Sequence, residues 1–136
     1  MRGTASRIPR IFPVWHDASV PLTVLIVDDH PSFRALARTV LQAEGFDVVG
    51  EAVDGASALS EAERLRPELV LLDAQLPDTD GFAVAAQLTR DGGGPAVVLT
   101  SSRDAADFGP LIAESGALGF VPKAELSAAA LAAFLP

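Results

Sequence analysis

Three aspartates stand where apolar runs of the chain end, at the point where a buried strand would reach the surface. Asp28 and Asp29 follow the run LTVLIV, and Asp73 closes the run LVLL and precedes a turn-like stretch, AQLPDTDG. Three carboxylates held within a few ångströms of one another are costly unless one is protonated or a cation binds among them. A hard divalent ion such as Mg2+ meets that need, because it takes carboxylate oxygens and leaves positions for phosphate oxygens.

Two further apolar runs lead to groups that suit a phosphoryl ligand. AVVL is followed by the hydroxyl of Thr100, and LGFV is followed, after one proline, by the ammonium of Lys123. Taken singly, a threonine fits any strand and a lysine is most often solvated, but together at successive strand ends they indicate a site. The two histidines, His16 and His30, look incidental. The absence of cysteine excludes thiolate nucleophiles and Cys-ligated zinc.

Alternating strands and helices would position these residues. Strand-like runs cover residues 22–28, 46–52, 69–73, 96–101 and 118–121. Three of them are near-continuous in Val, Leu and Ile, which is typical of strands buried on both faces. The repeat of strand and helix predicts an α/β fold, with a parallel sheet covered by helices on both faces. Ligands bind such sheets outside the carboxyl ends of the strands, where the polar residues are expected.

Caps, prolines and apolar stripes indicate helices between these runs. The helices are expected from Pro31 to Gly45, from Asp54 to just before Pro67, from Asp80 to the DGGGP turn at 91–95, from Pro110 to Gly116, and from Leu126 to Leu135. The inward stripe of the first helix would comprise Phe33, Leu36, Ala37, Val40 and Leu41. The last helix is almost entirely Ala, Leu and Phe, so both of its faces would be apolar.

Composition predicts one domain within these 136 residues, with 49% hydrophobic residues and a mean hydropathy of +0.33. No apolar run approaches the roughly 18–20 residues that span a bilayer. Residues 1–21 lack the apolar core of a signal peptide and are expected to form a flexible extension of a cytoplasmic protein. They carry a formal +2, which leaves −10 for a domain over residues 22–136. A domain that acidic argues against direct binding of nucleic acid.

The segments VLIVDDHPSFR, VLLDAQLPDTDGF, VVLTS and GFVPK follow one another in this order along the chain. On these segments the chain resembles the receiver domain of bacterial two-component response regulators, over residues 22–135. The resemblance implies a flavodoxin-like fold with strand order 2-1-3-4-5. It also implies a signalling switch that is no enzyme in the ordinary sense and catalyses only its own Mg2+-dependent phosphorylation and dephosphorylation. Its phosphoryl donor would be a sensor histidine kinase or a phosphotransfer protein.

The resemblance implies a role for each residue of the acidic site. Asp73 would be the phosphoacceptor and would form an aspartyl phosphate. Asp29 and Asp73 would bind Mg2+ (or Mn2+) directly, together with the backbone carbonyl of Gln75, while Asp28 would act mainly through a bound water. Lys123 would pair with the phosphoryl oxygens.

The resemblance also implies how the signal leaves the site. Thr100 would turn its hydroxyl toward the phosphoryl group, and Phe120 would move inward with it, unless Phe120 is simply a core residue. The surface of helix 4, strand 5 and helix 5 would change and control association with a downstream protein or with a second copy. A homodimer through helix 5 (Leu126–Leu135) is one expectation, because the outer face of that helix is apolar. Exposed alanines without a partner are the other reading of that face.

Two stretches depart from the family's pattern. Pro122 precedes Lys123, where many receivers have a proline after the lysine. The segment SRDAADFGP at 102–110 puts Gly-Pro where a fourth helix would continue, so we expect a long, mobile loop there.

Several alternative functions stay open at this point. No output domain follows within the chain, which suggests either a single-domain regulator or the N-terminal fragment of a longer DNA-binding regulator. A receiver-like interaction module that works without phosphorylation is the main competitor. A flavin-binding relative is disfavoured because Asp28 and Asp29 would repel the flavin phosphate. A hydrolase would normally carry its aspartyl nucleophile at the end of the first strand, whereas Asp73 ends the third.

Overall fold

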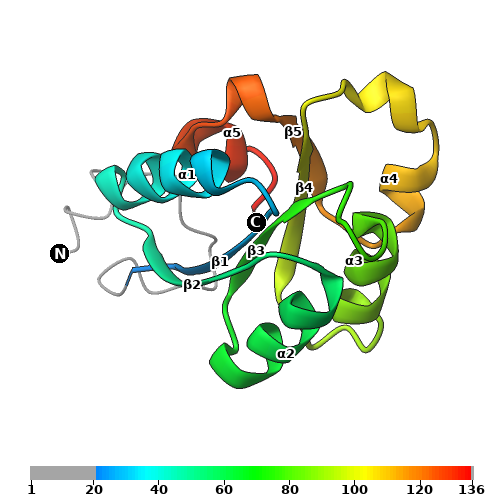
Figure 1. Cartoon of the computed structure of the whole chain (residues 1–136), viewed down its shortest axis with the longest axis horizontal. Coiled ribbons are helices and arrows are strands. Elements are labelled where there is room, and N and C mark those ends of the chain that lie inside the picture. Colours follow the sequence, from blue (N-terminus) through cyan, green and yellow to red (C-terminus); the bar gives the residue numbers. More distant parts are fainter. Residues whose placement is uncertain (1–20, 136) are drawn as a thin grey trace, which may run out of the picture.

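A computed structural model describes residues 21–135 of the chain. Five strands form one sheet, and every neighbouring pair is parallel (Figure 1). They are β1 (Thr23–Val27), β2 (Asp47–Ala52), β3 (Leu69–Asp73), β4 (Ala96–Ser101) and β5 (Gly119–Pro122). Their order across the sheet is β2-β1-β3-β4-β5, which confirms the predicted fold. The predicted extension, residues 1–21, lies outside the described residues apart from Pro21.

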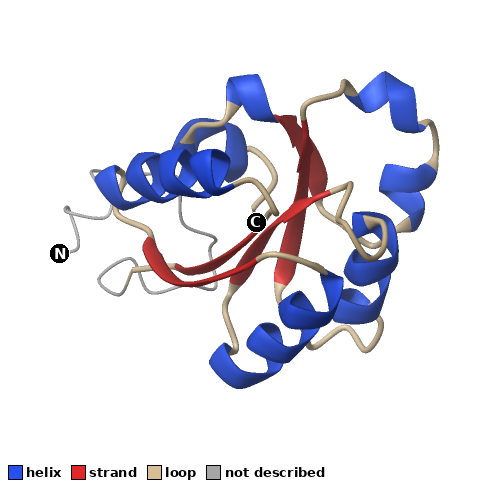
Figure 2. Cartoon of the chain, in the orientation of Figure 1, coloured by secondary structure: helices blue, strands red, loops and turns tan. Residues whose placement is uncertain are grey.

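Helices connect consecutive strands and lie on both faces of the sheet (Figure 2). The α-helices are α1 (Pro31–Ala43), α2 (Gly55–Leu65), α3 (Gly81–Thr89), α4 (Leu111–Glu114) and α5 (Ala128–Ala132), and η2 (Ala105–Phe108) and η3 (Lys123–Glu125) are 3-10 helices. The predicted caps are present, because Asp54 accepts from the amide of Ser57 and Asp80 from that of Ala83. Within the described residues, no helix is long and apolar enough to cross a bilayer.

The hydrophobic core consists of two layers, one on each face of the sheet. Helices α1 and α5 contribute to the first layer, and α2 and α3 contribute to the second. Their buried residues are Phe33, Ala37, Leu41, Ala128 and Leu131 in the first layer, and Ala58, Ala62, Val84 and Ala85 in the second. The strand residues alternate between the layers and are almost all fully buried in β1, β3 and β4, as expected for strands covered on both faces. This rigid sheet supports the loops at its carboxyl edge.

Helix α1 is less deeply seated than its sequence predicts. The expected inward stripe included Leu36 and Val40, but Leu36 is 53% exposed and Val40 is only partly buried. The helix faces the sheet through the narrower stripe of Phe33, Ala37 and Leu41, which are the buried positions. The prediction was therefore wrong for Leu36, because a stripe read from the sequence does not fix how the helix is rotated against the sheet.

The last helix is shorter than the predicted Leu126–Leu135. The hydroxyl of Ser127 accepts the amide of Ala130 at 3.0 Å and so sets the start of α5. Leu126 and Phe134 pack against the core, whereas Ala129 and Ala133 are exposed. The outer face of this helix thus carries small alanine side chains, and the homodimer through it stays a prediction.

The segment 102–110 contains a 3-10 helix, η2, which we did not predict from the sequence. Asp104 and Asp107 form a reciprocal capping arrangement at its start. At its end, Phe108 is only 9% exposed and its ring centroid lies 5.2 Å from that of Phe82 and 5.6 Å from that of Phe120. These three rings, which we call the aromatic row, anchor a stretch that we expected to be a long loop. The short fourth helix after Pro110 is confirmed as α4.

Candidate functional site

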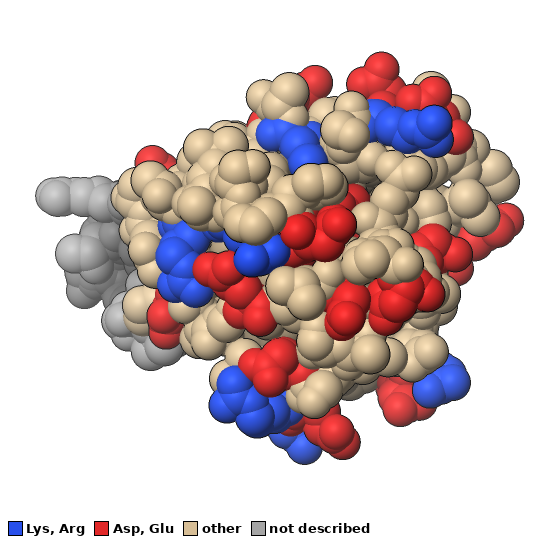
Figure 3. Space-filling model, viewed as in Figure 1, with Lys and Arg blue, Asp and Glu red and all other residues tan. Residues whose placement is uncertain are grey.

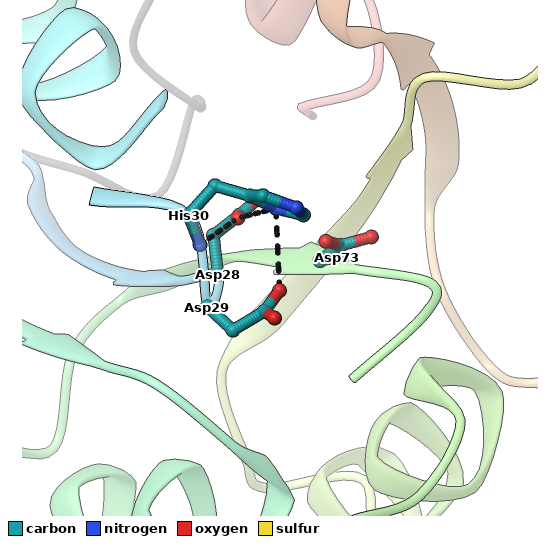
Figure 4. A group of neighbouring side chains, drawn as sticks. All are labelled: Asp28, Asp29, His30 and Asp73. Carbon is teal, nitrogen blue, oxygen red and sulfur yellow. Dashed lines mark hydrogen bonds and ion pairs between the residues drawn. The ribbon is translucent and has the colours of Figure 1, made fainter. Parts of the chain in front are cut away.

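The strand order brings the predicted site residues to the carboxyl edge of the sheet. β1 leads into Asp28, β3 ends at Asp73, and Asp73 is paired in register with Thr100 of β4. Ligand atoms of Asp28, Asp29, His30 and Asp73 all lie within 4.8 Å of one another (Figure 4). These four residues and Lys123, which follows β5, are called the acid cluster below. Acidic side chains run across the middle of this face, with basic side chains beside them and at its margin (Figure 3).

Lys123 joins the two buried carboxylates of the acid cluster. Its Nζ lies 2.6 Å from Oδ2 of Asp28 and 3.2 Å from Oδ2 of Asp73, and it also lies 4.7 Å from the ring centroid of Phe33. Lys123 thus reaches both carboxylates although Pro122 precedes it and no proline follows it. Residues 21–135 contain no cis peptide bond. The departure at Pro122 therefore does not displace the lysine from the position that its predicted role requires.

Burial and charge act differently on the two buried carboxyl groups. Burial raises the pKa of Asp73, and the nearby charge of Asp28 adds to this, while the amide of Gln75 and Lys123 only partly offset the rise. Burial acts in the same direction on Asp28, but hydrogen bonds from Lys123 and His30 outweigh it, and the pKa of Asp28 lies below its usual range. The amide of Gln75 donates to Oδ1 of Asp73 at 3.0 Å. Asp28 is thus the fixed anion of the site, and Asp73 is the carboxylate whose charge is least well compensated.

The side chain of His30 lies in the acid cluster, although no sequence pattern indicated it. Its backbone amide donates to Oδ1 of Asp28 at 2.8 Å, and its Nδ1 lies 3.0 Å from the same oxygen. Nδ1 also lies 3.2 Å from Oδ1 of Asp29. The interpretation of His30 as incidental was therefore wrong.

An ion-pair network holds the backbone of the acid cluster from the side of α1. Nη1 of Arg34 donates to the carbonyl oxygen of Asp28 at 2.7 Å, and its Nε lies 2.8 Å from Oε1 of Glu51. Nε of Arg38 lies 2.8 Å from the other oxygen of Glu51. The network fixes the end of β1 to α1 and to β2. Glu51 lies 17 and 13 residues after the two arginines, and only the charge signs of these residues could have suggested the network.

The turn after Asp73 is held by close backbone packing and by a side chain that the sequence did not single out. A Cβ added at Gly81 would lie 2.2 Å from the carbonyl oxygen of Asp73, so only glycine allows α3 to start this close to β3. Asp78 accepts from the amides of Gly55 and Ala56, at 2.7 and 3.0 Å. The turn is therefore docked on the first turn of α2.

Thr100 and Phe120 do not point to the acid cluster in this structure. The buried hydroxyl of Thr100 donates to the carbonyl oxygen of Val121 at 2.7 Å, across to β5. Phe120 is partly buried and packs on Phe108 in the aromatic row. The structure thus places Thr100 on β4, next to Asp73, and Phe120 on β5, one strand farther, but it does not bring either side chain into the site.

The donor set of the acid cluster suits a divalent cation. Three carboxylates face one ammonium, so two negative charges stay uncompensated while His30 is neutral. Oxygen donors from Asp28, Asp29 and Asp73 are the ligands that Mg2+ or Mn2+ prefers. Gln75 is exposed and lies two residues after Asp73, and its backbone amide contacts the Asp73 carboxylate.

A groove on the surface of the described residues lies away from this site. It runs between the ends of α2 and α3, and Leu59, Arg66, Leu88 and Pro95 are among its lining residues. None of the predicted site residues lines it. The chemistry of the described part of the chain is therefore concentrated at the carboxyl edge of the sheet.

The chain matches a known family over most of its length. The family model described as "Response regulator receiver domain" matches residues 24–134. A transcriptional regulator of Pseudomonas aeruginosa is 42% identical over 102 residues, covering 75% of this chain and 49% of that protein. The DNA-binding response regulator MtrA of Mycolicibacterium smegmatis is 45% identical over 102 residues, covering 74% of this chain and 43% of MtrA. The chain thus spans about half the length of the curated relatives it matches, or less.

Solved structures agree with this match. The signal receiver domain of the response regulator NarL from Mycobacterium tuberculosis superposes with a TM-score of 0.73 at 35% identity, covering 85% of this chain and 97% of that domain. The BeF3-activated N-terminal receiver domain of RstA from Klebsiella pneumoniae superposes with a TM-score of 0.72 at 32% identity, covering 82% of this chain and 93% of that domain. The chain belongs to the response regulator receiver domain family of two-component signalling.

Proposed function

We propose that the chain is a phosphorylation-dependent switch that accepts a phosphoryl group on Asp73 from a histidine kinase or a phosphotransfer protein. The observation that carries the proposal is the bridge formed by Lys123 between Asp28 and Asp73, with Nζ–Oδ2 distances of 2.6 and 3.2 Å. This bridge brings a cation to the carboxylate whose charge is least compensated. Family membership supports the same assignment.

The transfer requires little from the chain besides alignment and compensation of charge. An oxygen of Asp73 attacks the phosphorus of the donor's phosphohistidine. The O–P bond forms as the N–P bond breaks, and the electron pair of the broken bond leaves with the donor's imidazole. In its ionised form Asp73 needs no general base, because a carboxylate has no proton to lose before it attacks. Lys123 is placed to neutralise charge on the phosphoryl oxygens as they arrive beside Asp73.

Asp29, Asp73 and the carbonyl of Gln75 would hold Mg2+ or Mn2+, and Asp28 would act through a bound water. The bound ion would supply a second positive centre for the phosphoryl oxygens. Its binding is favoured by the two uncompensated negative charges of the acid cluster. Lys123 already occupies one oxygen of Asp28, which supports an indirect rather than a direct role for this carboxylate.

The signal would pass through Thr100 and Phe120 to the surface formed by α4, β5 and α5. A dianionic phosphoryl group on Asp73 would attract the hydroxyl of Thr100 away from the carbonyl of Val121, since charge-assisted hydrogen bonds are stronger than neutral ones. Phe120 would then repack in the aromatic row. The changed surface would control association with a downstream protein or with a second copy of the chain.

The experiment is intact-mass spectrometry after incubation with acetyl phosphate, with and without Mg2+. Wild type is expected to gain one phosphoryl adduct only with Mg2+, and Asp73→Asn is expected to gain none. Asp91→Asn is the matched control, because Asp91 is exposed in the turn after α3, and it should behave as wild type. No adduct on wild type, either from acetyl phosphate or from a cognate kinase, would favour a binding module that works without phosphorylation.

A second candidate is that this receiver domain regulates DNA binding as part of a longer protein. It is favoured by the curated relatives, which are transcription regulators about twice as long as the matched region. The net charge of −10 over residues 22–136 argues that this domain itself does not touch DNA. A cytoplasmic location would fit either candidate.

A further inference from the structure

His30 is placed where a ligand of the bound cation would stand. Its Nδ1 lies 3.0 Å from Oδ1 of Asp28 and 3.2 Å from Oδ1 of Asp29. The ring lies over these two carboxylates on the side toward Asp73 (Figure 4). The side chain is 63% exposed, so an ion can reach it from solvent.

We propose that Nδ1 of His30 is a nitrogen ligand of the divalent cation, and that the site consequently binds Mn2+ and Co2+ more tightly than Mg2+. The proposal rests on the metal-binding part of the proposed function and extends it to a residue that the predicted ligand set lacked. It concerns which ion the site selects and not whether Asp73 is the phosphoacceptor.

The distances suit six-coordinate geometry. Neighbouring ligands around an ion with bonds of about 2.1 Å lie about 3.0 Å apart, and opposite ligands about 4.2 Å apart. The separation of Nδ1 from Oδ1 of Asp29, 3.2 Å, matches that of neighbouring ligands, and Oδ1 of Asp28, 3.0 Å from Nδ1, would accept from a water bound to the ion. The whole group of ligand atoms lies within 4.8 Å, so a contraction of about half an ångström closes it around an ion.

The chemistry around Nδ1 points the same way. The two oxygens next to it belong to carboxylates, which only accept hydrogen bonds when ionised. Nδ1 can therefore either donate a proton to them or share a cation with them. Lys123 contacts Oδ2 of Asp28, whereas His30 contacts Oδ1, so the ammonium and the imidazole do not compete for one oxygen.

The nature of the donor sets the preference among ions. Imidazole nitrogen is a softer donor than carboxylate oxygen, and the affinity of such mixed sites for first-row transition ions rises from Mn2+ through Co2+ to Cu2+. Mg2+ prefers oxygen ligands and keeps several waters. Replacing one water by imidazole therefore favours Mn2+ and Co2+ over Mg2+.

The backbone around His30 holds the ring in place before an ion arrives. The amide of His30 donates to Asp28, and Pro31 follows as the first residue of α1. The ring thus starts from a fixed backbone position, and its Nδ1 already contacts Asp28 and Asp29.

The test uses the full chain and pulsed electron paramagnetic resonance of bound Mn2+. Wild type is expected to show modulation from a directly bound imidazole 14N. His30→Ala should lose this modulation, while His16→Ala, the control for the other histidine, should keep it. Calorimetric titration should show that His30→Ala weakens Mn2+ binding about tenfold or more, a loss on the scale of removing a metal-site partner. Binding of Mg2+ should change far less. His30→Asn, which keeps a polar side chain, should behave like His30→Ala.

The outcomes separate this proposal from the proposed function. Bound Mn2+ without imidazole modulation in wild type would overturn the role of His30 and leave the metal site in place. Equal losses of Mg2+ and Mn2+ affinity in His30→Ala would also overturn it, because they would indicate a purely structural role. If neither ion bound to wild type, the metal-binding part of the proposed function would itself be wrong, and the His30 proposal with it.

Discussion

The acid cluster and the aromatic row meet at β5, which contains Phe120 and leads into Lys123, but only the acid cluster is assembled for its proposed role. In the acid cluster, charged groups from β1, β3 and the end of β5 already meet, with Lys123 2.6 Å from Asp28 and 3.2 Å from Asp73. In the aromatic row, Phe120 packs on Phe108, and Thr100 beside it is bonded to β5 and not to Asp73. Under the proposed function, the difference would mean that the site for phosphoryl transfer is preorganised, whereas the residues that pass on the signal must rearrange.

The two regions also rely on different forces. The acid cluster depends on charge compensation near water, which ions and pH can alter. The aromatic row depends on burial of apolar rings, which ions barely affect. Perturbations of one region should therefore leave the other largely unchanged until Asp73 is phosphorylated.

Replacing Lys123 by methionine should have the largest effect. It removes the ammonium between Asp28 and Asp73, and phosphorylation by acetyl phosphate should slow by about a hundredfold or more, the usual cost of losing one group that stabilises transition-state charge. Mg2+ should bind more tightly, because the ion no longer competes with an ammonium for these carboxylates. Mass spectrometry of samples quenched at successive times would measure the phosphorylation rate, and calorimetry would measure the Mg2+ affinity. Arg90→Met, at the far end of α3, is the control for loss of one positive charge, and a wild-type rate in Lys123→Met would remove the lysine from the mechanism.

Phe108→Ala should affect the aromatic row and spare the acid cluster. Phe108 is 9% exposed, and its ring lies between those of Phe82 and Phe120. Loss of this ring should reduce the free energy of unfolding by about 2–3 kcal/mol. This is at or below the low end for buried phenylalanines, because Phe108 is in the segment that connects β4 to α4. Mg2+ affinity should change by less than about twofold, since none of the three rings belongs to the acid cluster. Urea denaturation and calorimetry test both statements.

Leu111→Ala is the control for Phe108→Ala, because Leu111 is 46% exposed in the next helix and its loss should cost no more than about 0.5 kcal/mol. A Mg2+ affinity that falls severalfold in Phe108→Ala would contradict the separation of the two regions.

The smallest effect should come from Asp73→Asn measured in the absence of divalent ions. Because burial raises the pKa of Asp73, its protonated form favours the folded state, and that contribution is lost as pH rises through the folded-state pKa. At pH 7 the Asn variant should therefore be more stable than wild type, by about 1 kcal/mol, the scale of a single net polar interaction. The gain should disappear at a pH below about 4, where Asp73 is protonated in both states.

Substitution of Asp28 by asparagine should change the stability at pH 7 in the opposite direction to the same substitution at Asp73. The pKa of Asp28 is lowered, because its bonds from Lys123 and His30 outweigh the effect of burial. Its contribution to stability is therefore present above the unfolded-state value and is lost as pH falls through the folded-state pKa. Asp28→Asn should be less stable than wild type at pH 7. Urea midpoints between pH 7.5 and pH 4 measure both variants, and a less stable Asp73→Asn at pH 7 would refute the assignment of Asp73 as the uncompensated carboxylate.

Much of the fold could be predicted from the sequence because periodicity and caps are local. The strand positions, the caps at Asp54 and Asp80 and the short helix after Pro110 each depend on neighbouring residues. The strand order came from the resemblance to a family, not from the apolar runs. Once that order is given, the meeting of Asp28, Asp73 and Lys123 follows from where their strands end.

The misses share a dependence on three-dimensional context. The exposure of Leu36 depends on how α1 is rotated against the sheet. The contacts of His30 depend on a backbone turn at the end of β1. The direction of the Thr100 hydroxyl depends on whether it donates to the carbonyl oxygen of Val121 or toward Asp73. The burial of Phe108 depends on partners 26 residues before and 12 residues after it in the chain. None of these is determined by spacing or residue type alone.

The contact of Asp78 with α2 gives the loop after Asp73 a remote reporter. Asp78 accepts from the amides of Gly55 and Ala56, which open α2. These two amide hydrogens exchange with solvent slowly only while the loop is docked on that helix. Hydrogen exchange at the start of α2 therefore registers any release of the turn that carries Asp78, without a probe in the acid cluster itself.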